Sequence, residues 1–160
     1  MSKVYIGIDN GVTGSIGIID TSSYTLIQTP VKKELSYTKK KQNITRIDVE
    51  EFTKILKAYK DKNCMVLLER PMVNPGRFKA TVSALRSLEA TIIVLEMLCL
   101  SYDYIDSKEW QKRLFPAGIK GTAALKKASL SKGKQLFPKA KCQNDCDGLL
   151  IAYYAQLTNR

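Results

Sequence analysis

The chain has 160 residues, which suits a single domain with a hydrophobic core of its own. It contains 26 Lys and Arg residues against 15 Asp and Glu residues, and the formal charge of +11 favours a polyanionic partner. Nucleic acid is the first candidate and an anionic membrane surface the second, while a merely solvated basic face is the alternative interpretation. The absence of histidine excludes a Ser-His-Asp triad and a zinc site built on histidine.

Cysteine spacing and apolar runs indicate where the protein works. Cys142 and Cys146 lie close together, but no second pair at zinc spacing accompanies them, so we expect unpaired thiols in a reducing compartment. The first residues show no signal-peptide pattern, and the longest apolar stretch, residues 91–100, is too short to cross a bilayer. We therefore expect a soluble protein of the cytoplasm with no membrane partner.

The first predicted element is a β-hairpin with a carboxylate at the end of its first strand. Residues 4–9 form a short apolar run that ends at Asp9, a glycine-rich turn follows, and residues 16–19 form a second apolar run. A buried carboxylate is costly unless a positive group meets it, so Asp9 is a candidate functional residue. Capping of the turn by the Asp9 side chain is the alternative interpretation.

The next residues complete the antiparallel part of the sheet and lead to a helix. Residues 24–28 predict a third strand, antiparallel to the second. Residues 30–46 are polar and rich in lysine, which predicts a solvent-exposed connection that either contacts phosphates or is simply solvated. Residues 49–59 predict a helix with Asp48 as its N-cap and an apolar face that packs on the sheet.

Residues 64–69 repeat the design of the first strand. A continuous apolar run, as expected of a central strand covered on both faces, ends at Glu69, and Pro71 stops the strand. The intervening helix permits a crossover that sets this strand beside the first, so that Asp9 and Glu69 project from neighbouring strand ends. Two such carboxylates raise each other's pKa unless a cation lies between them, and oxygen ligands favour Mg²⁺ or Mn²⁺.

A basic and aromatic loop leads from Glu69 into a long helix. Arg77, Phe78 and Lys79 suit phosphate contact and base stacking, while the alternative places Phe78 in the core as the helix starts. Residues 81–100 predict a helix whose apolar surface is wider than one core contact needs. This helix is our candidate subunit interface, unless it is buried deep within the monomer.

Lysines dominate the elements that follow the long helix. Residues 102–105 predict a short strand, Ser107 caps a brief helix, and residues 122–137 predict a lysine-rich helix. A set of lysines that gathers on one face of such elements can bind the DNA backbone, and a solvated helix face is the alternative. The lysines that we expect to contact DNA are Lys108, Lys112, Lys120, Lys126 and Lys127.

The last predicted helix begins with acidic residues. Asn144 or Asp145 can cap it, and Asp147 lies in its first turn, where the helix dipole by itself favours a carboxylate. Two acids just ahead of a buried helix, in a chain that already has two acids at strand ends, indicate a cluster of acids rather than capping alone.

The order of elements resembles that of the RNase H-like nucleases: a hairpin carrying Asp9, a third strand, a helix, a strand ending in Glu69, and a terminal helix opening with Asp147. Within that group the chain resembles the RuvC-type Holliday junction resolvases, particularly their phage-encoded members. Five motifs carry this resemblance in the family's order, and together they span nearly the whole chain. They are residues 7–11 (Gly-Ile-Asp-Asn-Gly), 67–71 (Leu-Leu-Glu-Arg-Pro), 108–116 (Lys-Glu-Trp-Gln-Lys, then Leu-Phe-Pro), 136–138 (Leu-Phe-Pro) and 147–152 (Asp-Gly-Leu-Leu-Ile-Ala).

The resemblance implies an RNase H-like α/β fold, with a central mixed five-stranded sheet flanked by helices and one nuclease domain over all 160 residues. Strands one to three would be antiparallel, and the later strands parallel to the first. The family's metal-binding acids correspond to Asp9, Glu69 and Asp147. A fourth acid usually stands a few residues before the last one; Asn144 occupies the position three residues before, and we assign the fourth ligand to Asp145.

By the same resemblance the activity is metal-assisted phosphodiester hydrolysis on four-way junction or branched DNA. Two Mg²⁺ ions per active site, for which Mn²⁺ can substitute, would activate a water molecule and stabilise the leaving 3′ oxygen. Lysines of residues 120–134 would bind phosphates. Because a four-way junction has two-fold symmetry, a resolvase would cut two strands as a homodimer. No small-molecule cofactor is expected.

Three alternatives compete with this interpretation. The opening Gly-Ile-Asp-Asn-Gly also resembles the phosphate-binding start of sugar kinases and actin-like ATPases, but those need two such domains and the chain is too short for them. A catalytically silent nucleic-acid-binding module is disfavoured, because carboxylates facing DNA repel phosphate without a metal ion. The third alternative is a nuclease of the same fold that acts on RNA or on another branched DNA, and the sequence barely distinguishes it from a junction resolvase.

Overall fold

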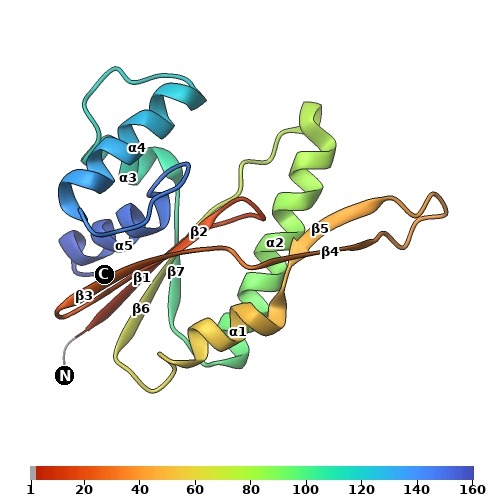
Figure 1. Ribbon diagram of the computed structural model, residues 1–160, viewed down its shortest axis with the longest axis horizontal. Helices are drawn as coiled ribbons and strands as arrows, with labels where there is room; N and C mark the ends of the chain where they lie inside the picture. Colours follow the sequence, from red (N-terminus) through yellow and green to blue (C-terminus); the bar gives the residue numbers. More distant parts are fainter. Residues whose placement is uncertain (1–2) are drawn as a thin grey trace.

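A computed structural model describes residues 3–160, and its centre is a five-stranded sheet (Figure 1). The strands are β1 (Val4–Asp9), β2 (Ser15–Asp20), β3 (Ser23–Gln28), β6 (Cys64–Glu69) and β7 (Tyr102–Ile105). Their order across the sheet is β3-β2-β1-β6-β7, with antiparallel pairing from β3 to β1 and parallel pairing from β1 to β7. The mixed five-stranded sheet predicted from the sequence is therefore confirmed.

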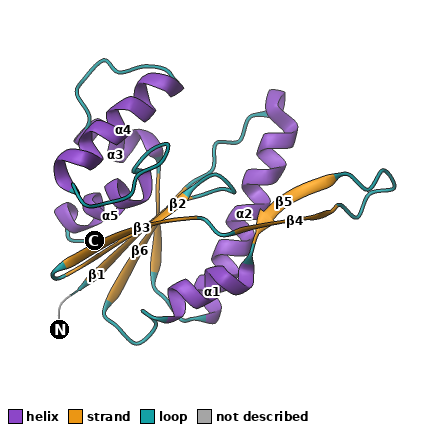
Figure 2. Cartoon of the chain, in the orientation of Figure 1, coloured by secondary structure: helices purple, strands orange, loops and turns teal. Residues whose placement is uncertain are grey.

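Two layers of helices cover the sheet, one on each face (Figure 2). Side chains alternate along the strands, so Ile6 and Ile8 enter the core on one face while Tyr5 packs in the core on the other. Because both faces are covered, the central strands are continuous apolar runs. One layer contains α1 (Val49–Lys57) and α2 (Phe78–Met97), and the other contains α3 (Ser107–Leu114), α4 (Thr122–Leu136) and α5 (Asp147–Thr158).

Helix α5 lies very close to β1 and β2 because glycines stand at the contact. A Cβ atom on Gly7 would overlap the backbone of α5, and one on Gly17 would overlap the backbone of Gly148. Gly148 in turn has no space for a Cβ atom against Ser15. The first turn of α5 is thereby set directly against the sheet, and Asp147, its first residue, is brought to the ends of the strands.

Residues 31–47 form a separate two-stranded β-hairpin, which we call the arm. The sequence predicted a solvent-exposed connection over residues 30–46; the segment is exposed, but it forms a regular hairpin rather than a loop. The strands β4 (Val31–Leu35) and β5 (Asn43–Ile47) pair with each other and with no strand of the main sheet, and the arm extends away from the body of the molecule (Figure 1). The β-branched residues of β5 favour a strand, but the surrounding lysines give the segment the composition of a loop.

Helix boundaries differ from the predictions by a few residues. Helix α2 begins at Phe78, after a 3₁₀ turn over Pro75–Arg77, and the Phe78 side chain is 73% exposed, so the alternative that placed it in the core is wrong. Asp106, rather than Ser107, occupies the N-cap position of α3. Helices α1 and α4 end slightly before their predicted boundaries. Within residues 3–160, none of the helices is both long and apolar enough to span a membrane.

The segment before α5 contains a disulfide. Cys142 and Cys146 are joined, with their Cα atoms 5.4 Å apart, so the expectation of unpaired thiols is wrong for this pair. The chain turns back between the two residues, which their spacing in the sequence could not show. Cys64 and Cys99 carry free thiols, as expected. Gly133 of α4 packs against the Cys146 side chain, so the closed loop is held against that helix.

Candidate metal centre

Three carboxylates from distant parts of the chain meet at one edge of the sheet. Asp9 is the last residue of β1, Asp147 is the first residue of α5, and Asp145 lies just before that helix. One carboxylate oxygen of each residue lies within 4.8 Å of the corresponding oxygens of the other two. Oxygen atoms at this spacing can bind one divalent ion together. The structure thus brings these three predicted residues into one site.

Glu69 lies beside these three residues on the neighbouring strand. In the parallel pairing of β1 with β6, Ile8 is opposite Leu68, so Asp9 and Glu69 follow at the same edge of the sheet. Glu69 is not part of the 4.8 Å group, but its charge raises the pKa of Asp9. We call the four residues, Asp9, Glu69, Asp145 and Asp147, the acidic cluster.

Burial is the main cause of large pKa shifts in the acidic cluster, and mutual repulsion adds to it. The pKa of Asp9 is raised well above its usual value, first by desolvation and then by the charges of Glu69, Asp147 and Asp145. Desolvation likewise raises the pKa of Asp147 to about 6 and that of Glu69 to about 7. A cation among these carboxylates would relieve both effects, so this all-oxygen donor set fits a divalent metal ion.

Two hydrogen-bond donors orient the acids, and the sequence pattern indicated neither of them as part of the site. The indole N–H of Trp110 donates to Glu69 Oε2 at 2.7 Å, which opposes the upward shift of the Glu69 pKa. Ser129 of α4 donates to Asp147 Oδ1 and accepts a hydrogen bond from the backbone N–H of Cys146 at 2.9 Å. The tryptophan is recognisable from sequence only as a core residue, and a single serine in a lysine-rich helix carries no pattern at all.

The start of α5 is held without a capping side chain at its N-cap position. Cys146 occupies that position and makes no side-chain cap hydrogen bond, so the prediction that Asn144 or Asp145 is the cap is wrong. Asp145 instead accepts a hydrogen bond from the N–H of Asp147 at 3.3 Å, and Ser15 of β2 accepts one from the next N–H at 3.1 Å. Asn144 is exposed, and it is Asp145 that joins the acidic cluster.

Lys126 of α4 is the predicted DNA-contacting residue whose charge reaches the acidic cluster. Its side chain is exposed, and its charge lowers the pKa of both Asp9 and Asp147. An exposed ammonium group at this position can contact a phosphate that lies over the acids.

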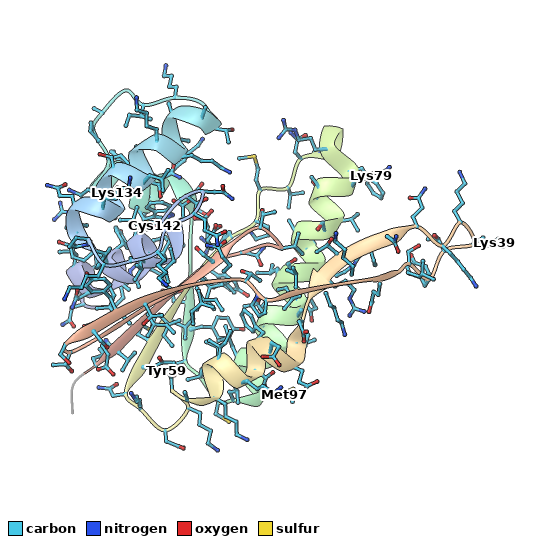
Figure 3. All side chains as sticks on the ribbon, in the orientation of Figure 1. Lys39, Tyr59, Lys79, Met97, Lys134 and Cys142 are labelled. Atoms are coloured by element: carbon cyan, nitrogen blue, oxygen red, sulfur yellow. A yellow bond between two sulfur atoms is a disulfide. The ribbon has the colours of Figure 1, made fainter. Side chains whose placement is uncertain are left out.

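The other predicted DNA-contacting residues lie at the start of α2, on α3, on α4 and in the loop before α4. Residues 77–79 are exposed at the start of α2, where Figure 3 labels Lys79, and α4 stands on the opposite side of this end of the sheet (Figure 1). A cleft of about 840 Å³ lies between α4 and the loop that precedes it, and it is lined by none of the four acids. Lys120 and Lys127 line this cleft, and Lys108 and Lys112 line the adjoining hollow against α3.

Comparison with solved structures identifies the fold. The chain is similar to T. thermophilus RuvC in complex with Holliday junction substrate, with a TM-score of 0.60 and 11% identity over 98% of this chain and 96% of that chain. It is also similar to a second Thermus thermophilus RuvC structure, with a TM-score of 0.54 and 14% identity over 99% and 97% of the two chains. No family model and no curated protein matches the sequence.

The chain therefore has the RuvC fold, an RNase H-like arrangement of a mixed five-stranded sheet between helices, as the sequence resemblance implied. The likeness extends over nearly the whole length of both chains.

Proposed function

We propose that the protein is a metal-dependent, structure-selective endodeoxyribonuclease that resolves four-way or otherwise branched DNA by paired phosphodiester hydrolysis. The observation that carries the proposal is the convergence of Asp9, Asp145 and Asp147 within 4.8 Å, with Glu69 on the adjacent strand end, in a chain with the RuvC fold. A Holliday junction substrate is bound in one of the similar RuvC structures, which supports this class of substrate. The charge of +11 supports a nucleic-acid partner.

The acidic cluster would hold two Mg²⁺ ions, or Mn²⁺ in their place. Such a pair of ions, when bound, supplies an activated water nucleophile and stabilises the leaving 3′ oxygen of the cut strand. The cluster provides only oxygen donors, which is the ligand type that Mg²⁺ prefers. Its carboxylates must be ionised to bind, and the raised pKa values of Asp9, Glu69 and Asp147 mean that protons compete with the metal near neutral pH.

The chain's own residues position the acids and the DNA. Trp110 holds the Glu69 carboxylate through its indole N–H, and Ser129 holds the Asp147 carboxylate through its hydroxyl. With both side chains fixed, the donor oxygens need little reorganisation when the substrate arrives. Lys126 offers an ammonium group that can bind the phosphate over the cluster and offset negative charge in the transition state.

We further propose that α2 forms the interface of a homodimer. Phe78, Leu85, Ile93 and Met97 are 73%, 43%, 45% and 72% exposed on this helix, which is more apolar surface than a solvated helix needs. A symmetric dimer would place one acidic cluster on each of two equivalent strands of a junction. Light scattering should then give about twice the chain mass of 18.0 kDa, and Ile93→Glu should reduce it to the monomer. A wild-type protein that stays monomeric on junction DNA would contradict the dimer.

Purified protein incubated with end-labelled four-way junction, linear duplex and RNA–DNA hybrid, with and without Mg²⁺, tests the function. We expect the wild-type protein to cut the junction but neither the duplex nor the hybrid, and to cut it when Mg²⁺ is added but not without it. Asp9→Asn should cut none of the three substrates. Preferential cutting of the hybrid would assign the chain to another nuclease of the same fold. Tight junction binding without cutting, in either Mg²⁺ or Mn²⁺, would make it a catalytically silent binding module. Equal cutting by Asp9→Asn would remove the acidic cluster from the mechanism.

A further inference from the structure

The arm, residues 31–47, carries positive charge out of proportion to its length. It contains six basic side chains and one acidic side chain, a net charge of +5 out of the chain's +11. The single acid, Glu34, is already neutralised, because it forms ion pairs with Arg46 and Lys32. Within residues 3–160, no ion pair includes the remaining lysines of the arm, which are Lys33, Lys39, Lys40 and Lys41.

The tip of the arm presents three consecutive lysines on an ordered turn. Its hydrogen bonds run from the N–H of Lys41 to Thr38 O at 2.9 Å and from the N–H of Ser36 to Gln42 O at 2.8 Å. Lys41 has a φ of 41°, in the left-handed region where glycine costs less than any residue with a side chain. The three lysines therefore extend from a turn whose backbone is held by hydrogen bonds.

The arm contributes little to the hydrophobic core. Ile47, at its base, is its buried residue, whereas Leu35 and Tyr37 are 60% and 95% exposed. A five-residue strand spans roughly 17 Å, so the tip stands well clear of the main sheet. Figure 3 shows Lys39 at the far end of the arm. Since the core uses the base of this hairpin and not its tip, the lysines of the tip are presented to solvent or to a partner.

We infer that the arm is a second DNA-binding surface, which holds the phosphate backbone of a duplex segment that lies away from the acidic cluster. The inference rests on the proposed function, because it assumes a branched DNA with duplex arms long enough to reach the tip. Lys39 and Lys40 contact phosphates, and the neighbouring Tyr37 hydroxyl can donate to a phosphate oxygen. Such contacts add affinity and fix the orientation of the DNA, but they read no sequence.

The test compares two double variants that remove equal charge. Lys39→Ala/Lys40→Ala changes the tip of the arm. Lys57→Ala/Lys60→Ala removes two exposed lysines, at the end of α1 and just after it, which form no ion pair within residues 3–160. Lys41 is left in place, because its left-handed backbone would add a conformational effect to the loss of charge. Thermal unfolding checks that both variants are folded. Binding is measured without Mg²⁺, between 50 and 200 mM salt, on junctions with long and with short duplex arms.

Each phosphate contact contributes about 0.9 to the slope of log affinity against log salt, so the tip variant should lose nearly two units of slope on the long-arm junction. Over that salt range the wild-type affinity should fall roughly tenfold more than that of the tip variant. The control variant should keep the wild-type slope, and the difference should vanish on the short-arm junction.

An unchanged salt slope in the tip variant, or an equal loss in the control variant, would overturn the inference. A change in molecular mass in the tip variant would assign the arm to contact between two copies of the chain instead. These results are separable from failure of the proposed function. A protein that binds DNA through the arm but cuts no substrate would refute the nuclease alone, and one that cuts junctions with an unchanged slope would refute the arm alone.

Discussion

The acidic cluster and the arm use charged residues in opposite physical settings. The cluster gathers four partly buried carboxylates, and desolvation and repulsion raise the pKa values of Asp9, Glu69 and Asp147. The position of each acid depends on packing from several elements. The arm spreads lysines along an exposed hairpin, where little packing surrounds them. The carboxylates of the cluster can act together only if packing places them precisely. The lysines of the arm need only be numerous and extend far enough to meet a partner. We expect changes in the cluster to affect the chemistry, and changes in the arm to affect binding.

The largest expected effect comes from removing one buried carboxylate. Asp147→Asn keeps the shape of the side chain but removes the charge, so the cluster would lose one of its proposed metal ligands. Metal assistance is worth several kcal/mol, and junction cleavage should fall roughly 1000-fold or more in a single-turnover assay. Junction affinity without metal should stay the same or increase, because a negative charge has been removed. Asp61→Asn, at an exposed acid, serves as the control and should cut normally.

The next largest effect is expected from a substitution at the close contact between α5 and the sheet. Gly148→Ala places a methyl group against Gly17 and Ser15, which lie too near to accept it. Such overpacking costs about 1–3 kcal/mol of unfolding free energy, and the displaced helix should carry Asp147 away from Asp9. The urea concentration at the midpoint of unfolding and the rate of cleavage should therefore both fall. Gly76→Ala, which meets only the Asn74 side chain, should leave stability nearly unchanged; equal losses in the two variants would contradict the role of the contact.

A smaller effect is expected from the hydroxyl that positions Asp147. Ser129→Ala removes the hydrogen bond to the carboxylate and the one that the hydroxyl accepts from Cys146 N–H. Loss of a residue that orients a metal ligand typically costs 10- to 100-fold in metal affinity. The Mg²⁺ concentration for half-maximal cutting should rise by about this factor, while cutting at saturating Mg²⁺ recovers. Ser131→Ala, at an exposed site on the same helix, should show the wild-type Mg²⁺ dependence.

The last prediction concerns stability alone, which should depend on pH in the absence of metal. The folded-state pKa values of Asp147 and Glu69, about 6 and about 7, lie above the usual values of 3.8 and 4.5. The unfolded chain therefore loses protons first, and their contribution to stability is complete below about pH 4 and is lost as pH rises through 6 and 7. Melting temperatures in EDTA should fall over this range. A matched titration of Glu69→Gln should show a shallower fall, and added Mg²⁺ should restore stability near neutral pH.

The sequence predicted the sheet and three acids of the acidic cluster, because the patterns that indicate them lie within short segments of the chain. Asp9 and Glu69 each interrupt an apolar run at a strand end, and the crossover rule places the two strands side by side. Asp147 was predicted from its place at the start of an apolar helix. These positions need no knowledge of the tertiary structure beyond the order of the elements.

The parts that sequence reasoning missed depend on contacts between distant residues. Ser129 joins the site only because α4 packs beside the start of α5, and nothing in the α4 sequence marks this serine. The arm was predicted as a loop because six basic residues outweighed the strand preference of its β-branched residues. The Cys142–Cys146 bridge depends on a reversal of the chain that two cysteines four residues apart do not reveal.

Residues that are far apart in the sequence contribute to the same acidic cluster, since Asp9 ends β1, Asp145 lies just before α5 and Asp147 begins it. A chain still being synthesised has Asp9 and Glu69 long before it has the other two. It therefore has no complete acidic cluster until α5 has been synthesised and has packed against Gly7 and Gly17 of the main sheet. A copy cut before α5 would keep two of the four acids and would lack the complete cluster.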